Sequence, residues 1–340
     1  MILLNQRDIA IDLMKVVGVF CVLNSHMDVF YGDYKYLSTG GTIGNALFFF
    51  CSGFSLFLNK RFSSFLAFPN WYKRRFNRIY PSVFAIALLS CLLLGYGPNL
   101  LHLIIYGGGW FVPCIMVYYI ICYALDVVVG NKPNLLLLSI FLVIIITFCI
   151  YMFFASSQNP YNILNLNESY LGLILFFSCM LLGIFVAKSK PRKCSTLVDF
   201  ILSVFFLLLF YIIYYFSRRY SCVYFMQPFC MLPMLGFLFY FYYLCSCNLM
   251  KKIYKKTCFK FIIMILVGMC LEMYLCQDSI ITLAKSHFKN NLDQIFPFGI
   301  ILIFLSVIVI AFIAHCLSIF ISQTFKEEDY NWRKIFVWYK

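Results

Sequence analysis

Charged side chains are scarce in this sequence. Only 12% of its 340 residues are charged, with 13 acidic residues against 27 basic ones, and long stretches carry no charge at all. It also lacks an internal repeat, a low-complexity linker and any polar stretch long enough to form a soluble domain. Because 63% of the residues are hydrophobic, these scarcities exclude a soluble globule and predict a polytopic membrane protein.

Metal-binding patterns are missing as well. The 16 cysteines are spread through the apolar runs, for example at Cys21, Cys51 and Cys91, and no CxxC pair or Cys/His cluster has metal-ligand spacing. Cysteines in such positions behave as small buried apolar side chains. We therefore expect no metal.

Apolar runs of about 20 residues predict roughly ten membrane spans. We expect an all-α, polytopic membrane helix bundle in which residues 1–340 form one membrane domain. The first run contains ionisable residues and no small-residue cleavage site, so we expect it to remain in the mature protein. The predicted spans lie near residues 8–29, 43–59, 79–97, 110–129, 135–154, 170–187, 197–216, 226–247, 261–281 and 297–322.

The basic residues gather in alternate connections between these spans. Basic residues are retained on the cytoplasmic side, so this bias predicts that both termini are cytoplasmic. Orientation then accounts for most of the net charge of +14, and we expect no nucleic-acid partner. The even-numbered connections hold Lys60, Arg61, Lys73, Arg74, Arg75, Arg78, Lys132, Lys188, Lys190, Arg192, Lys193, Lys251, Lys252, Lys255, Lys256 and Lys260, whereas the odd-numbered ones hold Lys35, Arg218, Arg219, Lys285 and Lys289.

The first span carries ionisable residues inside an apolar run, where they are costly. Lys15 and His26 are eleven positions apart, which on one helix places them on one face and roughly 16 Å apart along the axis. Imidazole changes its charge near neutral pH, so His26 is a candidate general base towards a hydroxyl. The alternative is an interfacial histidine, with Lys15 neutralised by Asp12.

Two further segments bring polar groups to span ends. Asn45 and Ser52, seven residues apart, either line a polar cavity or only accompany close packing at Gly44 and Gly53. The segment NWYKRRFNRIYP places Arg75 and Arg78 three apart beside Lys73 and Arg74. This cluster is either a topology signal or an anchor for a phosphorylated cofactor, because arginine forks match phosphate oxygens.

The remaining candidates lie in two other runs. GGGWFVPC, residues 107–114, holds Trp110 as an interfacial tryptophan or as part of a substrate entrance. CLEMYLCQ places Glu272 within a span, followed by Tyr274 and Gln277, and such a carboxylate faces a bundle interior or a polar cavity. The other histidines have no comparable setting; they are His102, His287 and His315.

In order and spacing, these segments resemble the acyltransferase-3 family of bacterial integral-membrane acyltransferases, which includes O-acetyltransferases of lipopolysaccharide, capsule and peptidoglycan. Lys15 and His26 match a basic-x10-His motif in which arginine is common at the first position. FFFCSGF, Phe48 to Phe54, and Arg75 to Arg78 look like the FFxxSGF and RxxR motifs. GGGWFVP looks like the glycine and tryptophan segment, and LEMYLCQ like a YLxH segment with glutamine in place of histidine. We expect a stand-alone form without a C-terminal esterase-like domain.

The resemblance implies transfer of an acyl group, usually acetyl from acetyl-CoA, to a hydroxyl of a cell-envelope glycan or its lipid-linked precursor. It implies acyl-CoA, a glycan and the lipid bilayer of the inner membrane as partners. The arginines would hold the CoA phosphates at the cytoplasmic mouth, and His26 would meet the acceptor as general base or acyl carrier. The expected site residues are His26, Lys15 and Glu272 for catalysis; Arg75, Arg78 and Arg74 for the donor; and Asn45, Ser52, Trp110 and Tyr274 for the substrate.

Two other classes remain open from the residues themselves. A transporter or flippase of a glycan precursor would use the same buried polar groups as a pathway, but the sequence lacks an inverted repeat or paired broken helices. A membrane glycan polymerase would need a large extracytoplasmic loop, and no connection is long enough.

Overall fold

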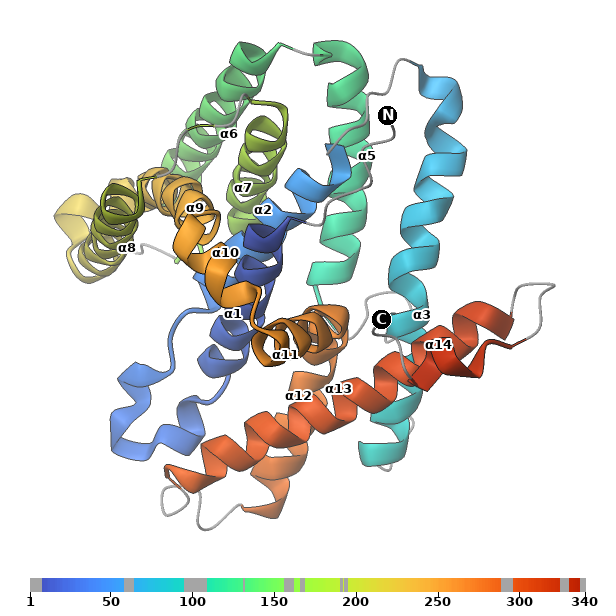
Figure 1. Ribbon diagram of the computed structural model, residues 1–340. Helices are drawn as coiled ribbons and strands as arrows, with labels where there is room; N and C mark the ends of the chain where they lie inside the picture. Colours follow the sequence, from blue (N-terminus) through green and yellow to red (C-terminus); the bar gives the residue numbers. More distant parts are fainter. Residues whose placement is uncertain are drawn as a thin grey trace. The chain divides into compact units, whose positions relative to one another are not determined.

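The computed structural model of the chain (Figure 1) describes residues 8–57, 64–94, 109–130, 132–155, 162–165, 169–189, 192, 195–288, 296–324 and 330–336. Of the residues that the structure describes, 89% are helical and none lies in a strand. This confirms the prediction of an all-α helix bundle. It is a multi-pass membrane protein, because many of its helices are long and apolar enough to cross a bilayer.

Each predicted span corresponds to a helix or to a pair of consecutive helices. Among the described residues, seven helices qualify as spans by length and composition, or up to nine if two bent pairs each count as one; α2 is a shorter apolar helix. The helices that match the spans are α1 (Ile9–Ser25) with η1 (Asp28–Leu37), α2 (Gly41–Phe57), α3 (Phe68–Leu94), α5 (Phe111–Val129), α6 (Pro133–Phe154), α7 (Leu171–Lys188), α8 (Thr196–Arg219), η3 (Ser221–Cys230) with α9 (Met231–Cys245), α11 (Thr257–Gly268) with α12 (Cys270–His287), and α13 (Phe298–Thr324). The short helices are η2 (Phe65–Ala67), α10 (Asn248–Tyr254) and α14 (Trp332–Phe336).

Three of the predicted boundaries are corrected by the structure. The first span is not one straight helix, because α1 ends at Ser25 and η1 turns away by 107°. The ninth is broken at Met269, where α11 and α12 meet at 64°. The third begins earlier than predicted, so Arg75 and Arg78 lie within the first turns of α3 and not before it. Apolar periodicity does not reveal a bend between two equally apolar helices.

The chain divides into two compact units. The first unit comprises Met1–Gly18, Asn45–Ser63 and Cys122–Phe259; the second comprises Val19–Gly44, Ser64–Ile121 and Lys260–Lys340. That residues 1–340 act as a single membrane domain stays a prediction.

In the first unit, helices pack closely where glycines remove side chains. A Cβ added at Gly53 of α2 would overlap the carbonyl oxygen of Met180 on α7, and one at Gly183 would overlap the carbonyl of Phe50. The packing role proposed for Gly53 is therefore confirmed. Elsewhere in this unit, α8 exposes large apolar side chains such as Leu197, Phe200 and Ile201, as expected for a surface that faces lipid tails.

In the second unit, α3, α12 and α13 pack against one another. Ser82 on α3 bonds to Glu272 on α12, and Ser90 bonds to Ser279 at 2.8 Å. From the first of these bonds to the second, the residue number rises on both helices, so α3 and α12 run parallel. The parallel arrangement agrees with the odd number of spans predicted between them.

Helix α13 runs in the opposite direction. It meets α12 through His315 near Glu272 and through the Val307 carbonyl, which accepts from the Cys276 thiol at 3.8 Å. As the residue number rises on α12 it falls on α13, as expected for two consecutive spans.

Candidate active site

His26 lies one residue beyond the end of α1, in the turn that leads into η1. Its side chain is 46% exposed, and its Nδ1 lies 3.7 Å from the Oδ1 of Asp278 on α12. The prediction that Lys15 and His26 share one helix face is wrong in this respect, because position 26 is no longer helical. The turn instead directs His26 to Asp278, in the same unit.

Asp278 is a functional candidate that sequence reasoning missed. It immediately follows Gln277, the last residue of the segment likened to the family motif, and its side chain is 64% exposed. A carboxylate near one ring nitrogen of a histidine stabilises the imidazolium and orients the ring, which leaves the other nitrogen for a substrate proton. The sequence showed only that Asp278 is an acidic residue near the end of an apolar run. The run itself did not indicate that its partner is His26.

Trp110 and Tyr274, both expected to bind substrate, lie in the second unit and are linked by Phe111. The Phe111 ring contacts the Tyr274 ring at 4.6 Å and the Trp110 ring at 5.9 Å between centroids. Asp278 also lies close enough to Tyr274 to interact electrostatically with it. The structure therefore brings Trp110 and Phe111 against the part of α12 that carries Asp278.

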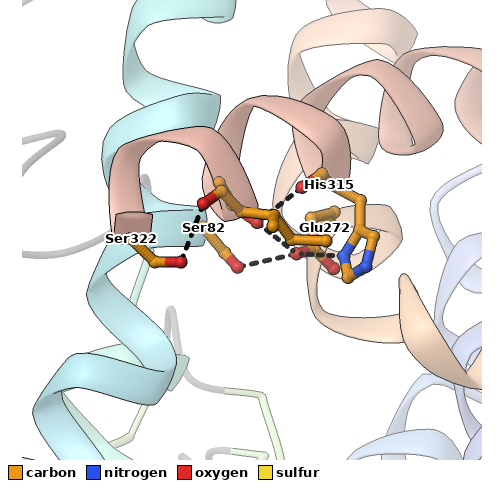
Figure 2. A network of polar contacts seen from close by, with 6 residues as sticks. Ser82, Glu272, His315 and Ser322 are labelled. Carbon is orange, nitrogen blue, oxygen red and sulfur yellow. Dashed lines mark hydrogen bonds and ion pairs between the residues drawn. The ribbon is translucent and has the colours of Figure 1, made fainter. Parts of the chain in front are cut away.

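Glu272 is the centre of a buried polar network (Figure 2). Its Oε1 accepts hydrogen bonds from the Ser82 hydroxyl at 2.7 Å and the Ser318 hydroxyl at 3.4 Å, and lies 3.0 Å from the His315 Nδ1. The residue is 2% exposed, and its Oε2 has no hydrogen-bond partner among the described residues. Glu272 thus faces the interior and ties α12 to α3 and α13.

This network corrects one prediction about histidines. His315 was expected to lack a setting comparable with that of His26, yet it is mostly buried and paired with Glu272. Its position inside a long apolar run concealed this, because the partner lies on another helix. His287 is exposed at the end of α12, and His102 lies outside the described residues.

The predicted donor-binding arginines form a basic cluster on α3, defined as Arg74, Arg75 and Arg78. The Arg75 guanidinium lies 5.3 Å from the centre of the Trp71 ring and interacts electrostatically with Tyr119. Its Nε is buried without a hydrogen-bond partner in the part of the chain that the structure describes. Arg74 and Arg78 are exposed.

Two other cations near helix ends are neutralised by carboxylates. In the first unit, Lys188 pairs with Asp126, and Arg192 pairs with Asp199. No carboxylate among the described residues forms an ion pair with any member of the basic cluster on α3. Three arginines that form no ion pair with another described residue are suited to an anionic ligand.

The remaining predicted residues belong to the first unit. Lys15 is half-buried on α1 and lies close enough to the Cys51 thiol to interact electrostatically with it. Buried Asp12 accepts a hydrogen bond from the Tyr254 hydroxyl at 3.3 Å. Asn45 and Ser52 are half-buried on α2. Their predicted roles stay predictions.

Some expectations fall outside the described residues, namely those on Lys60, Arg61, Lys190, Lys193, Lys289 and the glycines at 107 and 108. Among the residues that are described, no group of three or more histidine, cysteine, aspartate or glutamate side chains is placed to hold a metal ion.

Residues 8–316 match a family model described as an acyltransferase domain. The chain belongs to the acyltransferase-3 family. It is therefore an acyltransferase that moves a group other than an aminoacyl group. No curated protein and no solved structure matches it. Membership in the acyltransferase-3 family favours acyl transfer over the transporter or flippase alternative.

Proposed function

We propose that this acyltransferase takes an acyl group, in the simplest case acetyl, from acyl-CoA and transfers it to a hydroxyl of a cell-envelope glycan or its lipid-linked precursor. The basic cluster on α3 binds the donor phosphates, and His26 with Asp278 serves the acceptor hydroxyl. The donor enters from the cytoplasmic side of the inner membrane, and both termini are cytoplasmic, in keeping with the bias of basic residues.

The observation that carries this proposal is the spacing of two polar centres within the second unit. Arg75 precedes Ser82 by seven residues on α3, Ser82 bonds to Glu272, and Asp278 follows Glu272 by six residues on α12. At about 1.5 Å per residue, the basic cluster and the His26–Asp278 pair are roughly 20 Å apart along these parallel helices. This separation is comparable with the pantetheine arm, which links the phosphates of CoA to its thioester.

His26 and Asp278 are suited to a direct transfer of the acyl group from the CoA thioester to the acceptor hydroxyl. His26 accepts the proton of the acceptor hydroxyl as its oxygen attacks the thioester carbonyl, because a sugar hydroxyl does not ionise unaided at neutral pH. The new C–O bond forms, the C–S bond breaks, and the CoA thiolate takes the proton from the imidazolium. Asp278 stabilises the imidazolium while it carries that proton.

The reaction and its orientation are tested together with membrane vesicles from the cells in which the chain occurs. Acetyl-CoA labelled in its acetyl group does not cross a membrane, so inverted vesicles are expected to label the extractable glycolipid fraction, and right-side-out vesicles are not. Label in right-side-out vesicles alone would reverse the orientation. Movement of glycolipid across the membrane without any acetyl transfer would favour the flippase instead.

Replacing Arg75 with lysine tests the donor site. Lysine keeps the charge but loses the planar fork, so we expect the KM for acetyl-CoA to rise about tenfold with little change in kcat. Arg218→Lys is the matched control, because the Arg218 guanidinium also lies over an aromatic ring, that of Tyr214, at 5.4 Å. A change in the acceptor dependence alone would show that the cluster does not bind the donor.

A further inference from the structure

The segment that follows His26 exposes aromatic rings. In η1, Tyr34 is 48% exposed and Tyr36 is 69% exposed, whereas Phe30 is buried and fixes the segment to the protein. The Tyr34 ring stacks on Phe296 at 5.4 Å, and Tyr36 meets Tyr34 edge-on at 6.2 Å. Tyr34 and Tyr36, supported by Phe296, are called the aromatic platform below.

Hydrogen bonds from Asn24 hold this segment in place. The Asn24 Nδ2 donates to the Leu37 carbonyl at 2.8 Å and the Thr39 carbonyl at 3.0 Å, and its Oδ1 accepts from the Tyr31 hydroxyl at 2.6 Å. One side chain therefore holds both the first half of η1, at Tyr31, and its end, at Leu37. A loop fixed before the ligand arrives loses less conformational entropy when it binds.

The same bonds keep the aromatic platform near the proposed base. Tyr36 adjoins Leu37, whose carbonyl is bonded to Asn24, and His26 lies only two residues after Asn24. Two residues span at most about 7 Å. The exposed rings therefore lie within the reach of an acceptor whose hydroxyl is at His26.

We propose that the aromatic platform binds a sugar ring of the acceptor glycan, which rests on the proposed acyl transfer to such a glycan. The apolar C–H face of a sugar ring packs against an aromatic face, and its hydroxyls need hydrogen-bond acceptors at the edge. Asp28 and Asp33 of η1 are exposed carboxylates suited to that need. The aromatic platform sets which sugar is presented, whereas His26 sets which hydroxyl reacts.

Lipid is the competing occupant, since tyrosines also gather where a membrane meets water. Sugar is favoured because the exposed carboxylates Asp28 and Asp33 accompany these rings and can accept hydrogen bonds from sugar hydroxyls, whereas η1 has a single basic residue, Lys35, to attract anionic lipid. The ordering of η1 by Asn24 points the same way, because anchoring to lipid does not need a fixed loop geometry.

The test uses the whole membrane protein, with labelled acetyl-CoA as donor and the glycolipid fraction of the same cells as titrated acceptor. Tyr36→Ala is expected to raise the acceptor KM about tenfold and leave the donor KM unchanged. Tyr36→Phe keeps the ring and is expected to behave as wild type. Tyr170→Ala, which removes a tyrosine 76% exposed in the first unit, is the matched control and is expected to change neither KM.

Several results would overturn the aromatic platform. One is an acceptor KM that is unchanged in Tyr36→Ala, or that rises only as much as the donor KM. Another is a Tyr36→Phe variant whose acceptor KM rises as far as that of Tyr36→Ala. A third is the same rise in Tyr170→Ala, which would indicate membrane anchoring. If wild type itself transfers no acetyl, the proposed acyl transfer fails. If wild type is active and Tyr36→Ala matches it, only the aromatic platform fails.

Discussion

A His26→Gln variant is expected to lose acyl transfer by about 10²- to 10⁴-fold in kcat, the range that a positioned general base contributes. Glutamine is polar and of similar size but cannot accept and return a proton near neutral pH. The side chain is 46% exposed, so the substitution is expected to leave stability and membrane insertion nearly unchanged. The measurement is kcat for transfer from labelled acetyl-CoA to the glycolipid fraction, normalised to the inserted protein.

Two companion variants sharpen this expectation. Asp278→Asn keeps the shape of the partner but removes its charge, so we expect a smaller loss, confined to kcat, without a change in the donor KM. His287→Gln alters an exposed histidine on α12 and is expected to retain full activity. An inserted, abundant His26→Gln variant with wild-type kcat would remove the general base from the mechanism.

The buried network is expected to show its importance in stability. Removing His315 takes one hydrogen-bonding partner from the buried Glu272 carboxylate, and leaving a buried polar group short of a partner typically costs about 1–3 kcal/mol. His315→Leu and Glu272→Leu are therefore each expected to unfold at clearly lower temperature in detergent. Thermal unfolding of the purified protein provides the measurement, with His287→Leu as the exposed control.

A double variant, Glu272→Leu with His315→Leu, tests whether Glu272 has only a structural role or also takes part in the reaction. If the network only ties α3, α12 and α13 together, replacing Glu272 and His315 with leucine at the same time removes the unpaired group and is expected to restore much of the stability. Activity that returns with stability would exclude the catalytic role first expected for Glu272. Restored stability without activity would instead show that the carboxylate takes part in the reaction.

Local properties of the chain determined the class of protein. The lengths of the apolar runs predicted its membrane-spanning helices, and the segments around Lys15, Phe48–Phe54 and Arg75 predicted the acyltransferase family that the match over residues 8–316 shows. These features can be read from sequence because hydrophobic length and short motifs depend on neighbouring residues only.

The tertiary structure decided which of the polar residues meet. The bends after Ser25 and at Met269 are invisible to apolar periodicity, and the first of them directs His26 to Asp278. Glu272 accepts a hydrogen bond from Ser82, which is 190 residues away in the sequence, and its carboxylate lies beside His315 on a different helix. A buried polar side chain inside an apolar run shows only that it needs a partner. The identity of that partner depends on the packing of distant helices, and therefore only the tertiary structure could supply it.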